Sequence, residues 1–338
     1  METPNVRESP EAKSTVTQVT ETSGMLIGYF VNMSRISLHV ESGGDEVQLR
    51  VQCSGQGVPT LFLHGFPDDA DHWSDLVAAL QDRLRCWCPD LRGYRHSTKP
   101  AALEAYRVER LLGDVDALVT ALLAEADQSS TRFDAVNLVG HDWGGMLAWI
   151  YAGLRPERVR RLAVLNAPHP VRLAEVWRDD AAQRQASSYM KRLAHPQAAD
   201  RLAADDHALL RQLVTAESPG LTPAQLQRLL DGWRTPGALP AMCRWYAALE
   251  LAPSTAGPAT TPLDALAALC RPVTMPVCVV WGDRDGAFVP AVLEGLELWA
   301  PLLQVHRIAQ AGHWVLRSEL SVRQQALNVL SHFLAPPP

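Results

Sequence analysis

The sequence predicts an α/β fold with a mostly parallel, eight-stranded sheet flanked by helices. Six short apolar runs, typical of strands buried on both faces, follow one another between helical patterns at residues 60–63, 84–88, 135–139, 161–165, 277–281 and 303–308. Ahead of them, residues 36–39 and 47–51 alternate between apolar and polar side chains on either side of Gly43-Gly44. This pattern predicts an antiparallel hairpin at one edge of the sheet.

The strand pattern stops between about Pro170 and Cys270, which indicates an inserted helical domain. Leu, Ala, Arg and Trp recur there at helical spacing, and a linker rich in Pro, Ala and Thr follows at residues 252–262. A last helix is expected at roughly residues 321–334. The expected units are a flexible N-terminal tail, residues 1–33; an α/β core, residues 34–169 and 270–338; and a helical cap domain, residues 170–269.

Composition excludes several classes of partner. The chain has 47% hydrophobic and 20% charged residues, which is ordinary for a globular protein, and a net charge of -6 without a basic stripe for nucleic acid. No apolar stretch approaches the roughly 20 residues that span a membrane, and the polar N-terminal residues lack a secretory signal, so a cytoplasmic protein is expected. The six cysteines have no metal-site or redox spacing and are expected as buried thiols. Composition does not decide between a monomer and a homodimer.

The run 135–139 leads into GHDWGG and then into a helical pattern. This is the sharp strand-to-helix turn in which glycines let the residue between them stand clear as a nucleophile, and here that residue is Asp142. The N–H of Trp143, at the helix N-terminus, would form half of an oxyanion hole. The N–H of Phe66, in the motif HGFP after the run 60–63, would form the other half.

Five motifs carry a resemblance to a known family. HGFPDDADHW, DLRGYRHSTKP, GHDWGG, VWGDRDGAFVP and AGHW occur in this order over about residues 35–335. Together they resemble the epoxide hydrolase and haloalkane dehalogenase branch of the α/β-hydrolases. The resemblance implies the α/β-hydrolase fold with a helical cap, and a hydrolase that uses water as co-substrate with no cofactor and no metal.

A carboxylate that attacks carbon forms an ester, and water must then hydrolyse that ester. This step needs a histidine base held by a second acid. The resemblance places the base at His313, in AGHW, and the acid at Asp285, three positions after Gly282. Asp283 is the alternative for the acid.

Epoxides and alkyl halides place different demands on this machinery. An epoxide oxygen needs a proton from a weak acid, and the family pattern in the insertion assigns that role to Tyr189 and Tyr246. A phenol with a pKa near 10 stays protonated at neutral pH and can donate. The resemblance therefore implies an epoxide hydrolase that converts a small-molecule epoxide to a vicinal diol. His64, Trp143 and Trp314 are expected to line the substrate pocket.

Two other functions stay open. A haloalkane dehalogenase needs N–H donors around the departing halide; Trp143 could be one, but Phe66 has no side-chain N–H, so Trp177 or Trp233 would have to supply the second. A non-catalytic ligand-binding protein could keep the same pocket without turnover. The chain also departs from the family at Arg95, where glycine is usual, and this charge is expected to alter the entrance.

Overall fold

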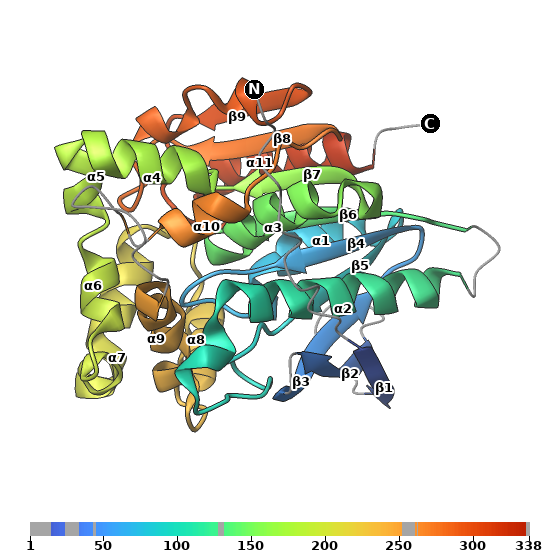
Figure 1. The fold of residues 1–338 in the computed structure, drawn as a ribbon, viewed down its shortest axis with the longest axis horizontal. Coiled ribbons are helices and arrows are strands. Elements are labelled where there is room, and N and C mark those ends of the chain that lie inside the picture. Colours follow the sequence, from blue (N-terminus) through green and yellow to red (C-terminus); the bar gives the residue numbers. More distant parts are fainter. Residues whose placement is uncertain are drawn as a thin grey trace, which may run out of the picture.

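The structure of the chain is a computed structural model, in which residues 15–23, 34–42, 45–127, 132–251, 261 and 263–335 are described. Within these residues nine strands form one sheet in the order β1-β2-β3-β5-β4-β6-β7-β8-β9 (Figure 1). Their bounds are β1 Thr15–Ser23, β2 Ser34–Ser42, β3 Asp45–Ser54, β4 Val58–Leu63, β5 Leu84–Pro89, β6 Val136–His141, β7 Val159–Leu165, β8 Val277–Gly282 and β9 Leu303–Ile308.

The strand directions confirm the mostly parallel sheet. The six apolar runs form β4 to β9, and every pair among these six strands is parallel. The two alternating stretches form β2 and β3, which pair antiparallel, and β3 pairs antiparallel with β5. The expected turn at Gly43-Gly44 lies outside the described residues.

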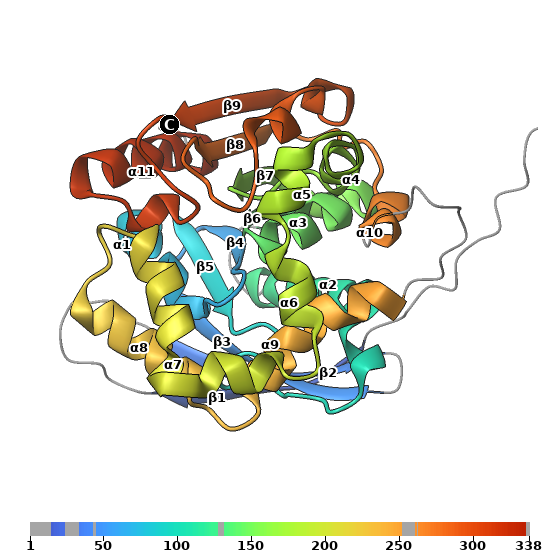
Figure 2. The same cartoon turned by 90° about the vertical axis from the view of Figure 1, so that its left-hand side faces the viewer.

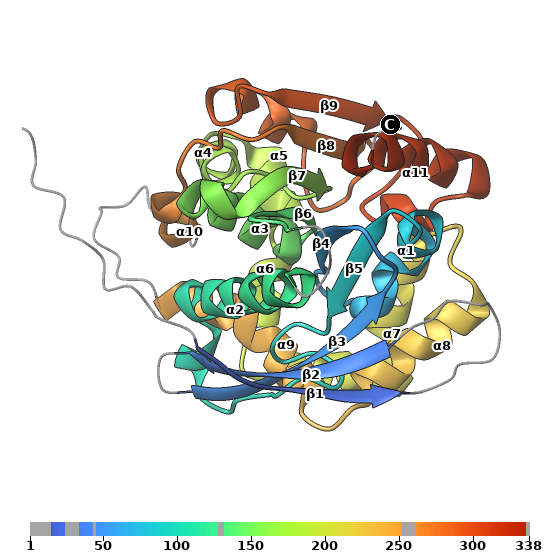
Figure 3. The ribbon, with the colours of Figure 1, turned by 90° about the vertical axis from the view of Figure 1, so that its right-hand side faces the viewer.

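One expectation for the N-terminal tail was wrong. Residues 15–23, read as part of a flexible segment, form β1, which pairs antiparallel with β2 and makes a ninth strand at the edge of the sheet (Figure 3). The segment is rich in Thr and Val, which favour strands, but it lacks the regular apolar alternation used to recognise one. The rest of that tail, residues 1–14 and 24–33, lies outside the described part.

Alternating side chains of the central strands feed two hydrophobic cores. Leu61, Leu63 and Leu138 pack on one face of the sheet, whereas Phe62 and Val139 pack on the other. Helices α2 (Val108–Ala126) and α3 (Trp143–Leu154) cover the first face, and α1 (Ser74–Leu80) and α11 (Leu320–Leu334) cover the second (Figure 2). Strands buried on both sides therefore read as continuous apolar runs in the sequence.

The chain between β7 and β8 contains helices and no strand in its described residues. These helices are α4 Pro170–Asp179, α5 Ala181–Ala186, α6 Tyr189–Ala194, α7 Ala198–Ala216, α8 Pro223–Trp233, α9 Ala238–Ala247 and α10 Asp264–Leu269. Helices α5 to α9 gather beyond one end of the sheet (Figure 1). Most of the expected linker, residues 252–260 and 262, lies outside the described residues. Across the described helices, none combines the length and apolarity needed to cross a bilayer.

The cysteines are buried thiols, as expected from their apolar surroundings. All six are free and buried: Cys53, Cys86, Cys88, Cys243, Cys270 and Cys278. Burial raises the pKa of Cys86 and of Cys278 to about 12. These thiols stay protonated at neutral pH and are poor nucleophiles.

Arg95 does not line the cavity described below. It adopts a positive φ of 37° and forms ion pairs with Asp69 at 3.0 Å and Asp71 at 2.7 Å. Gly232 of α8 lies close by, because a Cβ there would be 3.3 Å from Asp69 Oδ2 and 3.9 Å from Arg95 Cγ. The side chain therefore braces two core loops beneath α8 rather than altering the entrance.

Candidate active site

Asp142 occupies the sharp turn between β6 and α3, with φ 51° and ψ -123°. This region is unfavourable for a non-glycine residue and costs on the order of 1–3 kcal/mol. Close backbone packing around it requires glycine: a Cβ on Gly144 would lie 2.1 Å from the carbonyl oxygen of Leu63, and one on Gly140 would lie 2.5 Å from that of Gly144. The turn therefore fits tightly against β4 and presents the Asp142 side chain at the end of the sheet.

The Asp142 carboxylate is held by two backbone N–H groups. The N–H of Phe66 donates to Oδ1 at 2.8 Å, and the N–H of Trp143 also bonds the carboxylate. Gly65 permits this approach, since a Cβ there would lie 2.2 Å from Asp142 Oδ1. Burial raises the pKa of Asp142 to about 6, against the opposing effects of the His313 charge and the two N–H groups. The carboxylate is thus mostly ionised at neutral pH.

His313 lies between two carboxylates. Its Nδ1 is 2.9 Å from Asp285 Oδ2, and its Nε2 is 3.7 Å from Asp142 Oδ2. Asp283, the alternative acid, instead accepts a hydrogen bond from Arg307 at 2.8 Å. The structure therefore brings Asp142, His313 and Asp285 together in one line of contacts.

Asp285 is fixed by four donors. Its Oδ1 accepts from the N–H groups of Ala287 at 2.7 Å and Phe288 at 3.1 Å, and its Oδ2 accepts from Asn166 Nδ2 at 2.7 Å as well as from the histidine. Asn166 itself is fully buried at the end of β7. This geometry orients the acid toward Nδ1 of His313, so Nε2 is left facing Asp142.

The charges around His313 favour its protonated form. Burial lowers the pKa of the imidazole, but the carboxylates of Asp285, Asp142 and Glu217 outweigh burial and raise the pKa to about 9. At neutral pH the protein without substrate therefore holds an imidazolium beside an ionised Asp142. Loss of the charge on Asp142 would remove part of this stabilisation and lower the pKa of His313.

A cavity of about 570 Å³ opens over these residues. Asp142, His313 and Trp314 line it from the core, and Tyr189 and Tyr246 line it from the insertion. Five leucines of the insertion also line it: Leu193, Leu202, Leu209, Leu210 and Leu213. The cavity therefore suits a largely apolar ligand with one polar reacting group.

The two tyrosines lie against each other at the start of α6 and near the end of α9. Their ring centroids are 6.0 Å apart, and the Tyr246 ring also makes an edge contact with Phe66 at 5.5 Å. Burial raises the pKa of both phenols well above 10, and the negative charge of Asp142 adds to the effect. Both hydroxyls are therefore protonated at neutral pH and able to donate.

Two of the residues expected to line the pocket do not do so. His64 is fully buried; its Nε2 accepts from the N–H of Leu91 at 3.0 Å and its Nδ1 donates to the carbonyl of Gly65 at 3.0 Å, so the ring supports the loop from behind. The Trp143 ring packs against Trp245 and Tyr246, each at 5.5 Å, and is not part of the cavity wall. The side-chain directions could not be read from the motifs.

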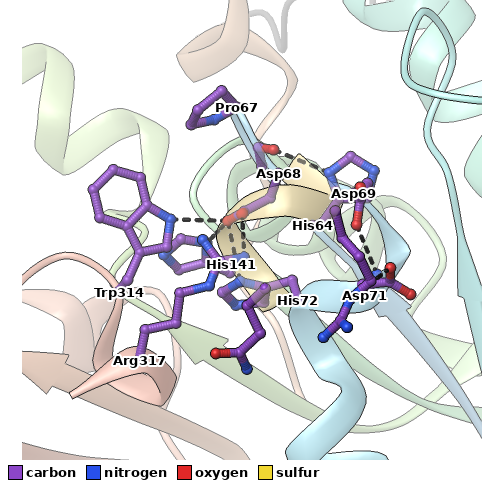
Figure 4. A network of polar contacts seen from close by, with 12 residues as sticks. His64, Pro67, Asp68, Asp69, Asp71, His72, His141, Trp314 and Arg317 are labelled. Carbon is purple, nitrogen blue, oxygen red and sulfur yellow. Dashed lines mark hydrogen bonds and ion pairs between the residues drawn. The ribbon is translucent and has the colours of Figure 1, made fainter. Parts of the chain in front are cut away.

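A buried polar network lies behind the site (Figure 4). Asp68 is at its centre: Oδ2 accepts from Trp314 Nε1 at 2.8 Å and lies 3.0 Å from His72 Nδ1, and Oδ1 is 2.5 Å from Arg317. Arg317 and the two neighbouring histidines hold the pKa of Asp68 well below its usual range, against burial. The Asp68 carboxylate is therefore ionised, and the Arg317 guanidinium already balances its charge.

This network contains a possible set of metal ligands. Ligand atoms of Asp68, His72 and His141 lie within 4.8 Å of one another. However, a dication there would sit beside the Arg317 guanidinium, which already balances the carboxylate. His141 also has another role, because its Nε2 bonds the carbonyl oxygen of His313 at 3.0 Å. We assign the group to support of the histidine loop rather than to a metal.

The chain is similar to known hydrolases in both sequence and structure. A model of the α/β hydrolase fold family matches residues 58–319. The AB hydrolase superfamily protein YfhM of Bacillus subtilis is 29% identical over 302 residues, which cover 88% of this chain and 95% of that protein. Epoxide hydrolase 3 of Mus musculus is 27% identical over 85% of this chain and 72% of its own length. The crystal structure of Bacillus megaterium epoxide hydrolase in complex with an inhibitor superposes with a TM-score of 0.74 at 30% identity, over 85% of this chain and 97% of that one.

A nucleophile turn, an acid and a histidine at the carboxyl ends of a mostly parallel sheet define a hydrolase fold. The chain belongs to the α/β hydrolase fold family. The resemblance drawn from the motifs is thereby confirmed, and epoxide hydrolases are among the proteins similar to this chain.

Proposed function

We propose that this protein is an epoxide hydrolase that opens epoxides to vicinal diols through an ester on Asp142. The observation that carries the proposal is that an ionised carboxylate and two protonated phenols line the same cavity. A nucleophile and an acid are the two groups that epoxide opening requires. The similarity to proteins named epoxide hydrolases supports the assignment.

In the first step Asp142 is alkylated. Oδ1 is held by the N–H of Phe66, so Oδ2 is the oxygen free to attack a ring carbon. The bond between that carbon and the ring oxygen breaks, and Tyr189 and Tyr246 donate to the developing alkoxide. The phenol that gives up its proton is reprotonated from solvent. The described helices within residues 170–269 act as the cap beneath which the epoxide binds.

In the second step water hydrolyses the ester. Alkylation removes the negative charge of Asp142, so the pKa of His313 falls and the imidazolium releases its proton to solvent. Held by Asp285, the neutral ring then takes a proton from water, and the hydroxide attacks Cγ of Asp142. The N–H groups of Phe66 and Trp143 hold the oxyanion that develops on Oδ1. Collapse breaks the bond to the glycol oxygen, the proton of the added hydroxide passes to that departing alkoxide, and the diol leaves with the carboxylate restored.

The dehalogenase alternative is less well supported. A departing halide needs N–H donors that face the cavity. The indole N–H of Trp233 already donates to the carbonyl of Pro67 at 2.7 Å, and that of Trp314 donates to Asp68 at 2.8 Å. Trp177 is not part of the cavity wall.

A single turnover in ¹⁸O-labelled water tests the proposal. Because water attacks the ester carbonyl, the label should enter Asp142 and the first diol should carry the unlabelled oxygen of the enzyme. Digestion and mass spectrometry of the peptide that contains Asp142 measure the first, and analysis of the diol measures the second. Direct entry of the label into the first diol, with none in the peptide, would exclude the ester.

Tyr189→Phe and Tyr246→Phe should each slow alkylation by about 10- to 100-fold, since the second phenol still donates. The double variant should lose about 10³-fold or more. The rate of adduct formation under single-turnover conditions measures this step, and binding of a diol product checks that the pocket is intact. A double variant that alkylates at the parent rate contradicts the role of the phenols.

The pH dependence of kcat/KM should show an acid limb. Asp142 reacts only as the carboxylate, and its pKa in the protein without substrate is about 6. Activity is therefore fully present above this value and falls by about tenfold for each pH unit below it. Rates measured between about pH 5 and about pH 8 with a non-ionising epoxide such as styrene oxide give the limb. A flat profile down to pH 5 would contradict it.

A further inference from the structure

Glu217 joins the helical insertion to both loops that carry the relay. It follows α7 directly, is half-buried and lines the cavity. Its Oε2 accepts from the N–H of His313 at 3.2 Å and lies 3.4 Å from the N–H of Gly286, which also donates to it. One carboxylate therefore bonds the backbone of the base and the residue next to Asp285.

The contact is closely fitted. A Cβ on Gly286 would lie 2.5 Å from Glu217 Oε1, and one on Gly312 would lie 3.5 Å from Oε2. The chain beyond Glu217 is held as well, because the N–H of Gly220 donates to the carbonyl of Arg317 at 2.7 Å. Glycine at position 286 thus leaves the space that the carboxylate fills.

The position of these two loops decides whether the relay is assembled. Gly286 follows Asp285, and Gly312 precedes His313. The Glu217 carboxylate therefore connects the two loops whose side chains form the 2.9 Å contact between acid and imidazole. Its charge also adds to those of Asp285 and Asp142 in raising the pKa of His313. Hydrogen bonds to a charged acceptor of this kind are stronger than those between neutral groups.

We propose that Glu217 is a positioning residue that latches the insertion to the acid and histidine loops and keeps His313 aligned for ester hydrolysis. This inference rests on the proposed epoxide hydrolase function. Alkylation needs Asp142 and the phenols but no proton transfer through His313. Ester hydrolysis needs the histidine and its acid. Loss of the latch should therefore slow the second step far more than the first.

Glu217→Ala and Glu217→Gln separate the latch from general stability. Under single-turnover conditions with styrene oxide, the alanine variant should form the adduct within about threefold of the parent rate but hydrolyse it at least about tenfold more slowly. The glutamine variant keeps an oxygen that both N–H groups can reach and should recover most of the hydrolysis rate. Asp200→Asn removes an exposed carboxylate from the first turn of α7 and should change neither step.

Gly286→Ala tests the same contact from the other side. The new Cβ would displace the flexible end of Glu217, so this variant should reproduce the slow hydrolysis. The double variant with Glu217→Ala should be no slower than the slower single variant, because both changes remove one interaction.

Three outcomes overturn the latch: equal slowing of both steps, unchanged hydrolysis in Glu217→Ala, or fully additive effects of the two changes. Each of these presupposes a parent protein that forms and hydrolyses the adduct. A parent protein that forms no adduct would instead refute the proposed function.

Discussion

Asp142→Ala is expected to lower kcat/KM for epoxide opening by at least about 10⁴-fold, because it removes the atom that bonds to the substrate. The fold should survive. Burial raises the pKa of the carboxylate, which means that its ionised form is held at an energetic cost. Steady-state diol formation measures the loss of activity, and a thermal melt measures whether the fold survives.

Asp142→Asn is the matched control for shape. Its side-chain oxygen can still accept from the N–H of Phe66, as Oδ1 does at 2.8 Å, but the amide is a poor nucleophile. It should bind epoxide with little change and be as inactive as the alanine variant. An alanine variant that retains turnover would show that water attacks the epoxide directly, and the ester scheme would be wrong.

His313→Gln is expected to accumulate the alkylated protein. The first step needs no base, whereas hydrolysis loses its general base and should slow by about 10²- to 10⁴-fold. Intact-protein mass spectrometry after mixing with excess styrene oxide should find one added substrate mass per chain. Little diol should form in the same period.

Two further variants test where the adduct forms and which acid holds the histidine. Combining His313→Gln with Asp142→Asn should remove the added mass, since the nucleophilic carboxylate is gone. Asp283→Asn should leave ester hydrolysis nearly unchanged, because Asp283 contacts Arg307 and not the imidazole. An adduct that persists in the double variant would place the bond on another residue.

The sequence by itself determined eight of the nine described strands, β2 to β9, and the nucleophile turn. The runs that form β4 to β8 could be located because strands buried on both faces are largely apolar. The edge strand β9 was located as well, although most of its residues are partly or fully exposed. The turn at Asp142 lies within one contiguous stretch, in which a Cβ on Gly140 would lie 2.5 Å from the carbonyl oxygen of Gly144. Local sequence suffices where the constraint is local. The placement of His313 and Asp285 rested on a resemblance to a known family.

Only the tertiary structure decided which side chains support the relay and which way others face. Asn166 reaches Asp285 across 119 positions of the chain, and Glu217 reaches His313 across 96. In the sequence, the role of Asn166 is indicated only by its position as a polar residue directly after a buried strand. Nothing in the helical pattern around Glu217 indicates its role. His64 points away from the cavity because its ring bonds the backbone of Leu91 and Gly65. Contacts between distant segments depend on how helices and loops pack in three dimensions, and a periodic pattern along the chain does not encode that packing.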